Sequence, residues 1–144
     1  MKHRARGITT VEFAIVSSVL FTILFGVIEL GRLMYTFNAL AEGTRRAARL
    51  ATVCPLNDAG ISSTANFATL PNFNSGNVQV QYLNASGTPT GTYSAIVYVQ
   101  VQIIGYAIPL SIPFINPTVT SPAFAVTLPR ESLGVTPTAT YTCS

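Results

Sequence analysis

The chain has little charge and few of the side chains that usually perform catalysis. Only 9% of its 144 residues are charged, whereas roughly 25% is usual for soluble domains. Tryptophan is absent, and the single histidine is His3. No Ser-His-Asp or Cys-His arrangement is therefore available beyond the first residues, and two isolated cysteines lack metal-site spacing. We expect no enzyme, no cofactor and no small-molecule substrate.

The positive charge is concentrated at the N-terminus. The net charge is +3, and three of the eight basic residues are Lys2, Arg4 and Arg6. Without residues 1–7, five arginines face five acidic residues. No basic face interleaved with aromatic side chains remains to bind a phosphate backbone. A nucleic-acid partner is therefore not expected.

An acidic residue, Glu12, stands at the start of an apolar run. Residues Phe13 to Ile28 contain no charge, and a carboxylate at the centre of a bilayer helix costs roughly 2.5–3.5 kcal/mol, less near its edge. Gly7 precedes Glu12 by five positions. Cleavage after Gly7 would make Ile8 the first residue and Glu12 the fifth. This spacing resembles the type IV prepilin signature.

Three interpretations of the N-terminus share a basic start and an apolar core: a cleaved secretory signal, a permanent anchor, and a prepilin leader followed by a helix. Residues 39–41, Ala-Leu-Ala, mimic a signal cleavage site. They lie far beyond the apolar core, and Glu12 fits an ordinary signal poorly. The 18 residues from 11 to 28 span about 27 Å as a helix, close to the thickness of a bilayer core. We therefore expect a transmembrane segment at about 11–30.

Glu29 and Arg32 mark the outer membrane interface in this interpretation. Their i, i+3 spacing lets the two charges neutralise each other on one helical face. We expect a local interfacial ion pair.

The helical pattern continues past the membrane segment. Steps of three and four place a set of apolar residues on one stripe: Leu30, Leu33, Met34, Phe37, Leu40, Ala41, Ala47, Ala48 and Ala51. Pro55 ends the pattern. We predict one helix over residues 8–53, apolar all round in its first half and amphipathic in its second. The alternative is two helices with breaks at Gly31 and Gly43.

The remainder, residues 54–144, is predicted to be rich in strands. Residues 57–77 are polar and indicate a loop or a poorly packed connection. Apolar and polar residues alternate at 78–82, at 96–104, where Val97 is expected on the apolar face, and at 124–128, which predicts three antiparallel strands. Prolines interrupt residues 109–122, so this stretch cannot be an interior strand throughout.

Two cysteines bracket the strand-rich region. Cys54 follows the predicted helix, and Cys143 is next to the last residue. A disulfide between them suits an oxidising compartment; two unrelated buried thiols are the alternative. The predicted fold class is α+β, with the long helix packed on a small, three-stranded antiparallel sheet.

Short blocks in residues 5–53 carry a likeness to a known family. They are Arg6-Gly7, Val11-Glu12-Phe13-Ala14, Gly26-Val27-Ile28-Glu29-Leu30-Gly31-Arg32, Tyr35, Asn38-Ala39 and Ala47-Ala48-Arg49. Together they resemble the TadE-like family, minor pilins or pseudopilins of the tight-adherence (Flp) type IV pilus system. The strand-rich region resembles the family only loosely.

The resemblance implies a leader at residues 1–7, with prepilin peptidase cutting between Gly7 and Ile8. Glu12, followed by Phe13, would then pair with the new α-amino group of Ile8 in a neighbouring pilin. Implied partners are the peptidase, other pilin subunits, the pilus assembly platform and the bacterial inner membrane. The implied function is assembly of a pilus for adhesion or biofilm formation, with the N-terminus cytoplasmic and the C-terminal domain periplasmic or extracellular. The alternative is a single-pass anchored periplasmic binding module that is neither processed nor assembled.

Overall fold

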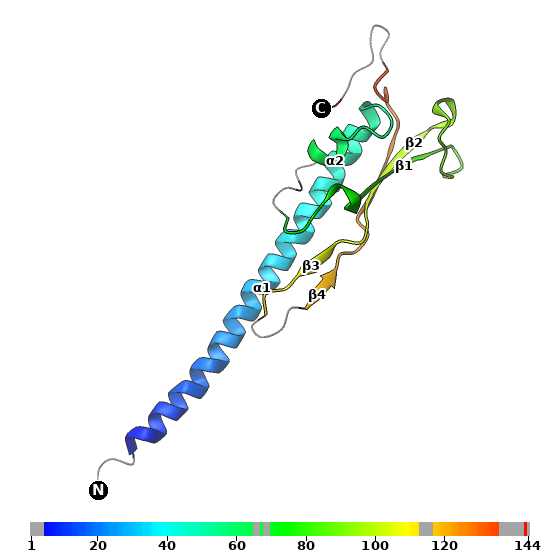
Figure 1. Ribbon diagram of the computed structural model, residues 1–144. Coiled ribbons are helices and arrows are strands. Elements are labelled where there is room, and N and C mark those ends of the chain that lie inside the picture. The colour runs from blue at the N-terminus through cyan, green and yellow to red at the C-terminus, as the bar shows by residue number, and fades with distance from the viewer. Residues whose placement is uncertain (1–4, 65–66, 68–69, 113–116, 136–142, 144) are drawn as a thin grey trace.

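A single long helix organises the structure (Figure 1), a computed structural model that describes residues 5–64, 67, 70–112, 117–135 and 143. Helix α1 runs from Ala5 to Val53 over 49 residues. It begins three residues before the predicted start and ends where predicted. Neither Gly31 nor Gly43 interrupts it, so the alternative of two helices is wrong. His3, Lys2 and Arg4 of the predicted leader lie outside the described residues.

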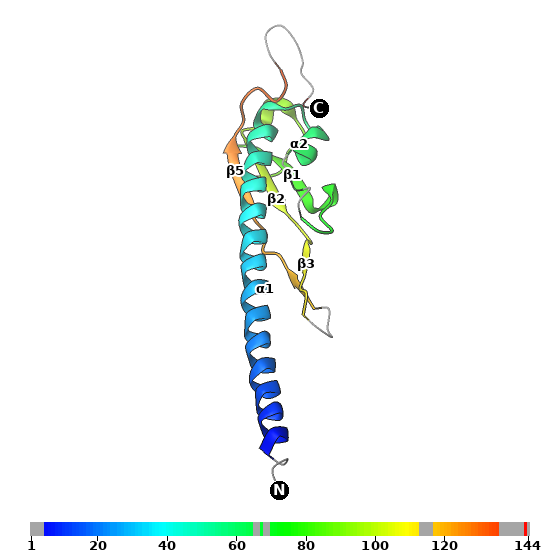
Figure 2. The ribbon, with the colours of Figure 1, turned by 90° about the vertical axis from the view of Figure 1, so that its left-hand side faces the viewer.

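A three-stranded antiparallel sheet packs along the C-terminal half of α1 (Figure 2). Its strands are β1 (Val78–Leu83), β2 (Tyr98–Ile103) and β5 (Ala125–Pro129), in the order β1-β2-β5. The three valines Val80, Val101 and Val126 lie opposite one another across the sheet. These elements confirm the predicted α+β class and the three predicted strands.

The core lies between the apolar face of the sheet and the apolar stripe of α1. Val99 and Val101 are fully buried on β2, and Leu40 is fully buried on α1. Three alanines of the stripe, Ala47, Ala48 and Ala51, are also fully buried. Their small side chains allow the sheet to approach the helix closely, and burial of the larger apolar side chains stabilises the contact. One expectation was wrong: Val97 precedes β2 and is 36% exposed.

A second, two-stranded sheet lies nearer the N-terminal end of α1 than the first (Figure 1). It pairs β3 (Ala107–Pro109) with β4 (Thr118–Thr120). Between them Leu110 donates its N–H to the carbonyl of Pro117 at 2.9 Å, and Pro113 lies outside the described residues. The prolines end the strands rather than forbid them, because Pro109 stands at the last position of β3. This β3–β4 hairpin was not predicted.

The connection at 57–77, predicted to be a loop, contributes to the core. It contains α2 (Gly60–Thr64) and the 3-10 turn η2 (Ser75–Asn77); a further turn, η3 (Tyr93–Ala95), precedes β2. Ile61 and Phe67 are buried, and the rings of Phe67 and Phe73 stack with centroids 4.3 Å apart. The prediction failed because these apolar residues follow neither helical nor strand periodicity.

Candidate functional site

The N-terminal half of α1 extends alone beyond every strand (Figures 1 and 2). Every large apolar side chain from Ile8 to Ile28 is between 46% and 73% exposed. The helix is long and apolar enough to cross a membrane, and none of its most apolar window is buried inside the protein. An apolar surface of this extent is a site for a membrane or another protein rather than for water.

Glu12 lies on this bare surface. It shares one shallow apolar face with Gly7, Ile8, Val11 and Ile15. Ile8 and Glu12 are on the same side because four residues are slightly more than one helical turn. Phe13 lies beside this face and is 73% exposed, more than any other large apolar side chain in the part of the chain that the structure describes. The predicted cleavage point and the predicted acidic assembly residue are thus neighbours on the helix.

Glu29 and Arg32 form more than the local pair that their spacing predicts. Nη2 of Arg32 lies 2.5 Å from Oε1 of Glu29, and Nε of Arg32 donates to Oε2 of Glu29 at 3.2 Å. The same Nη2 also donates to the backbone carbonyl of Pro109. The backbone N–H of Ser111 donates to Oε1 of Glu29 at 2.9 Å. We call these four groups the Glu29–Arg32 clamp.

The clamp fixes the β3–β4 hairpin to α1 across a wide gap in the sequence. The Glu29 side chain is 15% exposed and that of Arg32 is 35% exposed, so both charges are partly shielded from water, and paired hydrogen bonds offset the cost of shielding them. Tyr106, directly before β3, is 2% exposed and donates its hydroxyl to the carbonyl of Pro71 at 2.9 Å. Burial raises the pKa of Tyr106. Pro109 and Ser111 contribute only backbone atoms to the clamp, so no side-chain signal in the sequence identifies them.

At the opposite end of α1, the two cysteines meet. Cys54 and Cys143 form a disulfide with their Cα atoms 5.7 Å apart. Asp58 contacts the same cysteine: its Oδ2 accepts the N–H of Cys143 at 3.0 Å, and its Oδ1 accepts that of Gly60 at 2.7 Å. These two N–H groups lower the pKa of Asp58. A Cβ on Gly60 would lie 1.6 Å from the Cys143 carbonyl oxygen, so only glycine fits there.

Residues 131–134 cap the C-terminus of α1. The Thr52 carbonyl accepts the N–H of Leu133 at 3.1 Å, and the Val53 carbonyl accepts that of Gly134 at 2.6 Å. These bonds satisfy carbonyls that have no partner inside a helix. Gly134 has a φ of +77°, and an added Cβ would lie 2.6 Å from Cγ of Pro55. Both constraints require glycine at this position.

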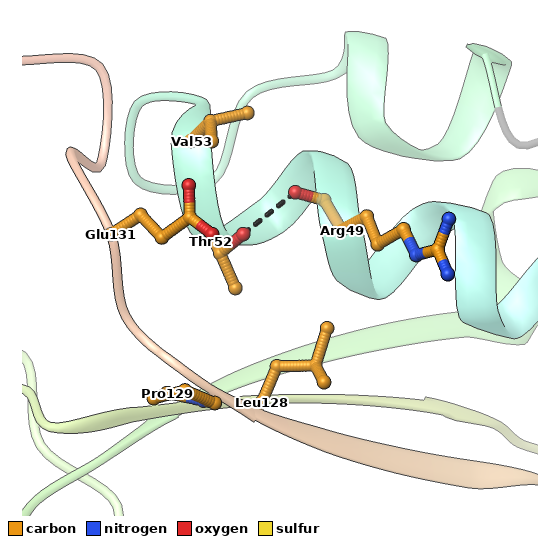
Figure 3. Close-up of a pocket in the computed structure, with 6 residues that line it drawn as sticks. All are labelled: Arg49, Thr52, Val53, Leu128, Pro129 and Glu131. Carbon is orange, nitrogen blue, oxygen red and sulfur yellow. Dashed lines mark hydrogen bonds between the residues drawn. The ribbon is translucent and has the colours of Figure 1, made fainter.

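An open groove of about 450 Å³ runs between this helix end and β5 (Figure 3). Its lining residues are Arg49, Thr52, Val53, Leu128, Pro129 and Glu131. Leu128 points toward the helix in Figure 3, and Thr52 donates its hydroxyl to the Arg49 carbonyl at 2.7 Å. Sequence reasoning did not predict this groove. It lies at the end of α1 opposite to the bare apolar segment.

The bare segment and the clamp fall inside one stretch of sequence that matches a known family. Residues 7–49 match the family model of the TadE-like protein. The match confirms the resemblance predicted from the short blocks, and it begins at Gly7 and ends four residues before α1 does. Searches of curated proteins and of solved structures find no match to the chain.

The TadE-like match indicates a membrane protein associated with a Tad pilus. It covers the helix that is apolar enough to span a membrane, together with Glu12, Glu29 and Arg32. The match ends at residue 49, before Cys54, so it gives no information on the strand-rich region. Its functional interpretation therefore rests on how it is attached to the TadE-like helix.

Proposed function

We propose that the protein is a non-enzymatic minor pilin, or pseudopilin, of a tight-adherence type IV pilus. In this proposal prepilin peptidase cuts between Gly7 and Ile8, and the mature protein joins other pilins through the bare half of α1. The observation that carries the proposal is the TadE-like match over residues 7–49 on a helix whose large apolar side chains from Ile8 to Ile28 are all exposed.

The exposed apolar segment supports a location in the inner membrane before assembly. The 18 residues from 11 to 28 span about 27 Å as a helix, and the bilayer core is about 30 Å thick. In this location the basic residues before Gly7 stay cytoplasmic, as the positive-inside rule favours. The sheet, the disulfide and the groove then lie in the periplasm, where disulfides persist.

Glu12 supports assembly with other pilins. A neighbouring subunit shifted along the helix axis by four residues, about 6 Å, would bring its new α-amino group on Ile8 to the level of Glu12. An ion pair in an apolar bundle offsets part of the burial cost of both charges, and removal of one partner leaves the other uncompensated. The pair would set the register between subunits, while apolar helix packing supplies most of the affinity. The assembled filament would serve adhesion or biofilm formation.

The decisive experiment is to determine the N-terminal residue by mass spectrometry on protein taken from its native cell envelope. We expect a mature N-terminus at Ile8, and at Met1 in a strain without prepilin peptidase. An N-terminus at Met1 in both strains would mean a permanently anchored module that is not processed. An N-terminus at Glu42 would mean a secreted strand-rich domain without pilin function.

A further inference from the structure

The β3–β4 hairpin is fixed beside the point where the uncharged surface of α1 ends. Glu29 is the first charged residue after the uncharged run from Phe13 to Ile28, and its carboxylate accepts the N–H of Ser111. The hairpin is therefore held at one defined level along the helix, the level of residues 29–32. This level determines which surroundings the hairpin meets.

Residues 29–35 mark a membrane–water boundary if α1 spans a bilayer. The apolar run that ends at Ile28 matches the thickness of the bilayer core, so Glu29 falls at its outer edge. Tyr35 is 62% exposed and lies about 9 Å further along the axis, within the headgroup layer, where tyrosines are enriched. Leu30 and Met34 are 61% and 51% exposed, so the apolar surface of the helix continues into this layer.

The hairpin itself carries no charge. In the sequence, no charged residue stands between Asp58 and Arg130, so β3, β4 and their connection contain none. Ile112, just past the clamp, is 39% exposed. An uncharged segment with an exposed isoleucine at a lipid boundary avoids the cost of placing charge next to hydrocarbon.

The backbone donors next to the clamp are also accounted for. Pro109 has no N–H, Leu110 donates its N–H to the carbonyl of Pro117, and Ser111 donates its N–H to Glu29. The carbonyl of Pro109 accepts from Arg32. Unsatisfied backbone groups are costly near lipid, and irregular backbone with these groups paired can approach a bilayer at lower cost.

We propose that the β3–β4 hairpin is an interfacial membrane contact, with Ile112 in the headgroup–acyl boundary of the outer leaflet and the Glu29–Arg32 clamp holding it there. The ligand is the phospholipid surface itself. The inference rests on the proposed function, since it requires α1 to span the bilayer. It adds a second point of contact, which would restrict tilting and rotation of the sheet relative to the membrane.

The absence of tryptophan from the chain permits a direct test. The full-length Ile112→Trp protein is reconstituted into phosphatidylcholine–phosphatidylglycerol vesicles with lipids brominated either near the headgroup or near the chain end. Phe21→Trp marks the middle of the apolar run, and Tyr98→Trp marks the far end of the sheet. Tyr98 is 38% exposed, a close match to Ile112 at 39%.

We expect the Ile112→Trp emission to be quenched chiefly by the shallow bromines, that of Phe21→Trp chiefly by the deep ones, and that of Tyr98→Trp by neither. Quenching of Phe21→Trp with no quenching of Ile112→Trp would overturn this inference and leave the proposed function standing. Blue-shifted but unquenched emission from Ile112→Trp would also overturn it, because protein rather than lipid would then cover the hairpin. No quenching of Phe21→Trp would overturn both.

A second pair of variants tests the clamp. In the Ile112→Trp background we expect Glu29→Ala to abolish most of the shallow quenching, because Ser111 and Arg32 lose their shared partner. The matched control is Glu42→Ala, which removes an acid that pairs with Arg46 on the exposed face of α1 at 3.0 Å. Equal shallow quenching in the Glu29→Ala and Glu42→Ala variants would show that the clamp does not position the hairpin.

Discussion

Oδ2 of Asp58 accepts a hydrogen bond from the backbone N–H of Cys143, 85 residues further along the chain. The contact stands beside the disulfide, because Cys54 precedes Asp58 by four positions and its sulfur is bonded to that of Cys143. Two independent links, one covalent and one electrostatic, therefore fix the same end of the chain to the C-terminus of α1.

The Asp58 contact predicts a stability that depends on pH. Its pKa is lowered from the ordinary value of 3.8 in the folded protein, so its contribution is present above that value and is lost as pH falls through the lowered pKa. We expect Asp58→Asn to lower the Tm of the detergent-solubilised protein at neutral pH, with the deficit shrinking in acid. Thermal melts between about pH 2 and pH 7 measure this difference.

The control for Asp58→Asn is Glu131→Gln, which also removes one negative charge but from an exposed side chain. Its effect on Tm should be small. A deficit in Asp58→Asn that stays constant down to the lowest pH would contradict a role for the carboxylate charge.

The disulfide predicts a large loss of stability on removal. It closes a loop with a sequence separation of 89, and loops of this length are worth about 4–5 kcal/mol in the chain-entropy account. We expect the double variant Cys54→Ser/Cys143→Ser to lower the free energy of unfolding by up to about that amount, as measured by chemical denaturation. The parent protein in dithiothreitol should show the same shift, and an unchanged midpoint in both would contradict the prediction.

Gly43 is predicted to tolerate no side chain, although alanine favours helix. A Cβ at this position would lie 2.3 Å from Cε1 of Phe67, and the Phe67 ring is buried and stacked on Phe73. We expect Gly43→Ala to destabilise the protein by about 1–3 kcal/mol, the range for overpacking. Denaturant unfolding of the full-length protein measures it.

Gly31 provides the matched control for Gly43, because nothing lies within 4 Å of a Cβ added there. Gly31→Ala should stabilise the helix by up to about 1 kcal/mol. Adding Phe67→Leu to Gly43→Ala should recover part of the loss by making room. Two alanine variants of equal stability would show that the Phe67 ring does not constrain Gly43.

Glu12 and Gly7 are predicted to act at different steps. We expect Gly7→Ala to leave the precursor uncut, and Glu12→Ala to permit cutting but to impair incorporation into filaments. Loss of one partner from a buried ion pair costs about 3–5 kcal/mol, enough to deplete the variant strongly from sheared filaments. Immunoblots of envelope and filament fractions separate the two defects.

The control for Glu12→Ala is Glu42→Ala, which lies on the exposed face of the same helix and should incorporate normally. Normal incorporation of Glu12→Ala would argue against the proposed pairing with Ile8 of a neighbour. A processed Gly7→Ala protein would argue against the proposed cleavage site.

The sequence was sufficient for the elements with a regular period. Apolar residues spaced by three and four predicted most of the buried stripe of α1, but Leu30 and Met34, which were placed on it, are exposed. Alternating residues such as Val99 and Val101 predicted β2. Burial on one face produces such periods, so they are readable without a structure. The TadE-like resemblance could also be recognised from the sequence, because it lies in short blocks of residues on one helix.

The sequence was insufficient where contacts use backbone atoms or irregular spacing. The clamp joins Glu29 and Arg32 to the backbone of Pro109 and Ser111, and backbone atoms leave no trace in residue types. Phe67 reaches the core from a polar connection because one glycine, Gly43, leaves space for its ring. Such space is a property of two segments together, and neither segment signals it alone.

The cap on α1 has a consequence for the order of events during synthesis. The last carbonyls of the helix obtain their partners from residues 131–134, and Ser132 reaches Val53 across 79 positions. Until residues 131–134 have emerged, the end of the helix lacks its cap, and until residues 125–129 have emerged, β5 is missing from the sheet. A stalled or truncated chain therefore exposes its alanine stripe and an open sheet edge, features that favour aggregation and degradation. Folding of the domain is in this sense a test that translation has passed residue 134.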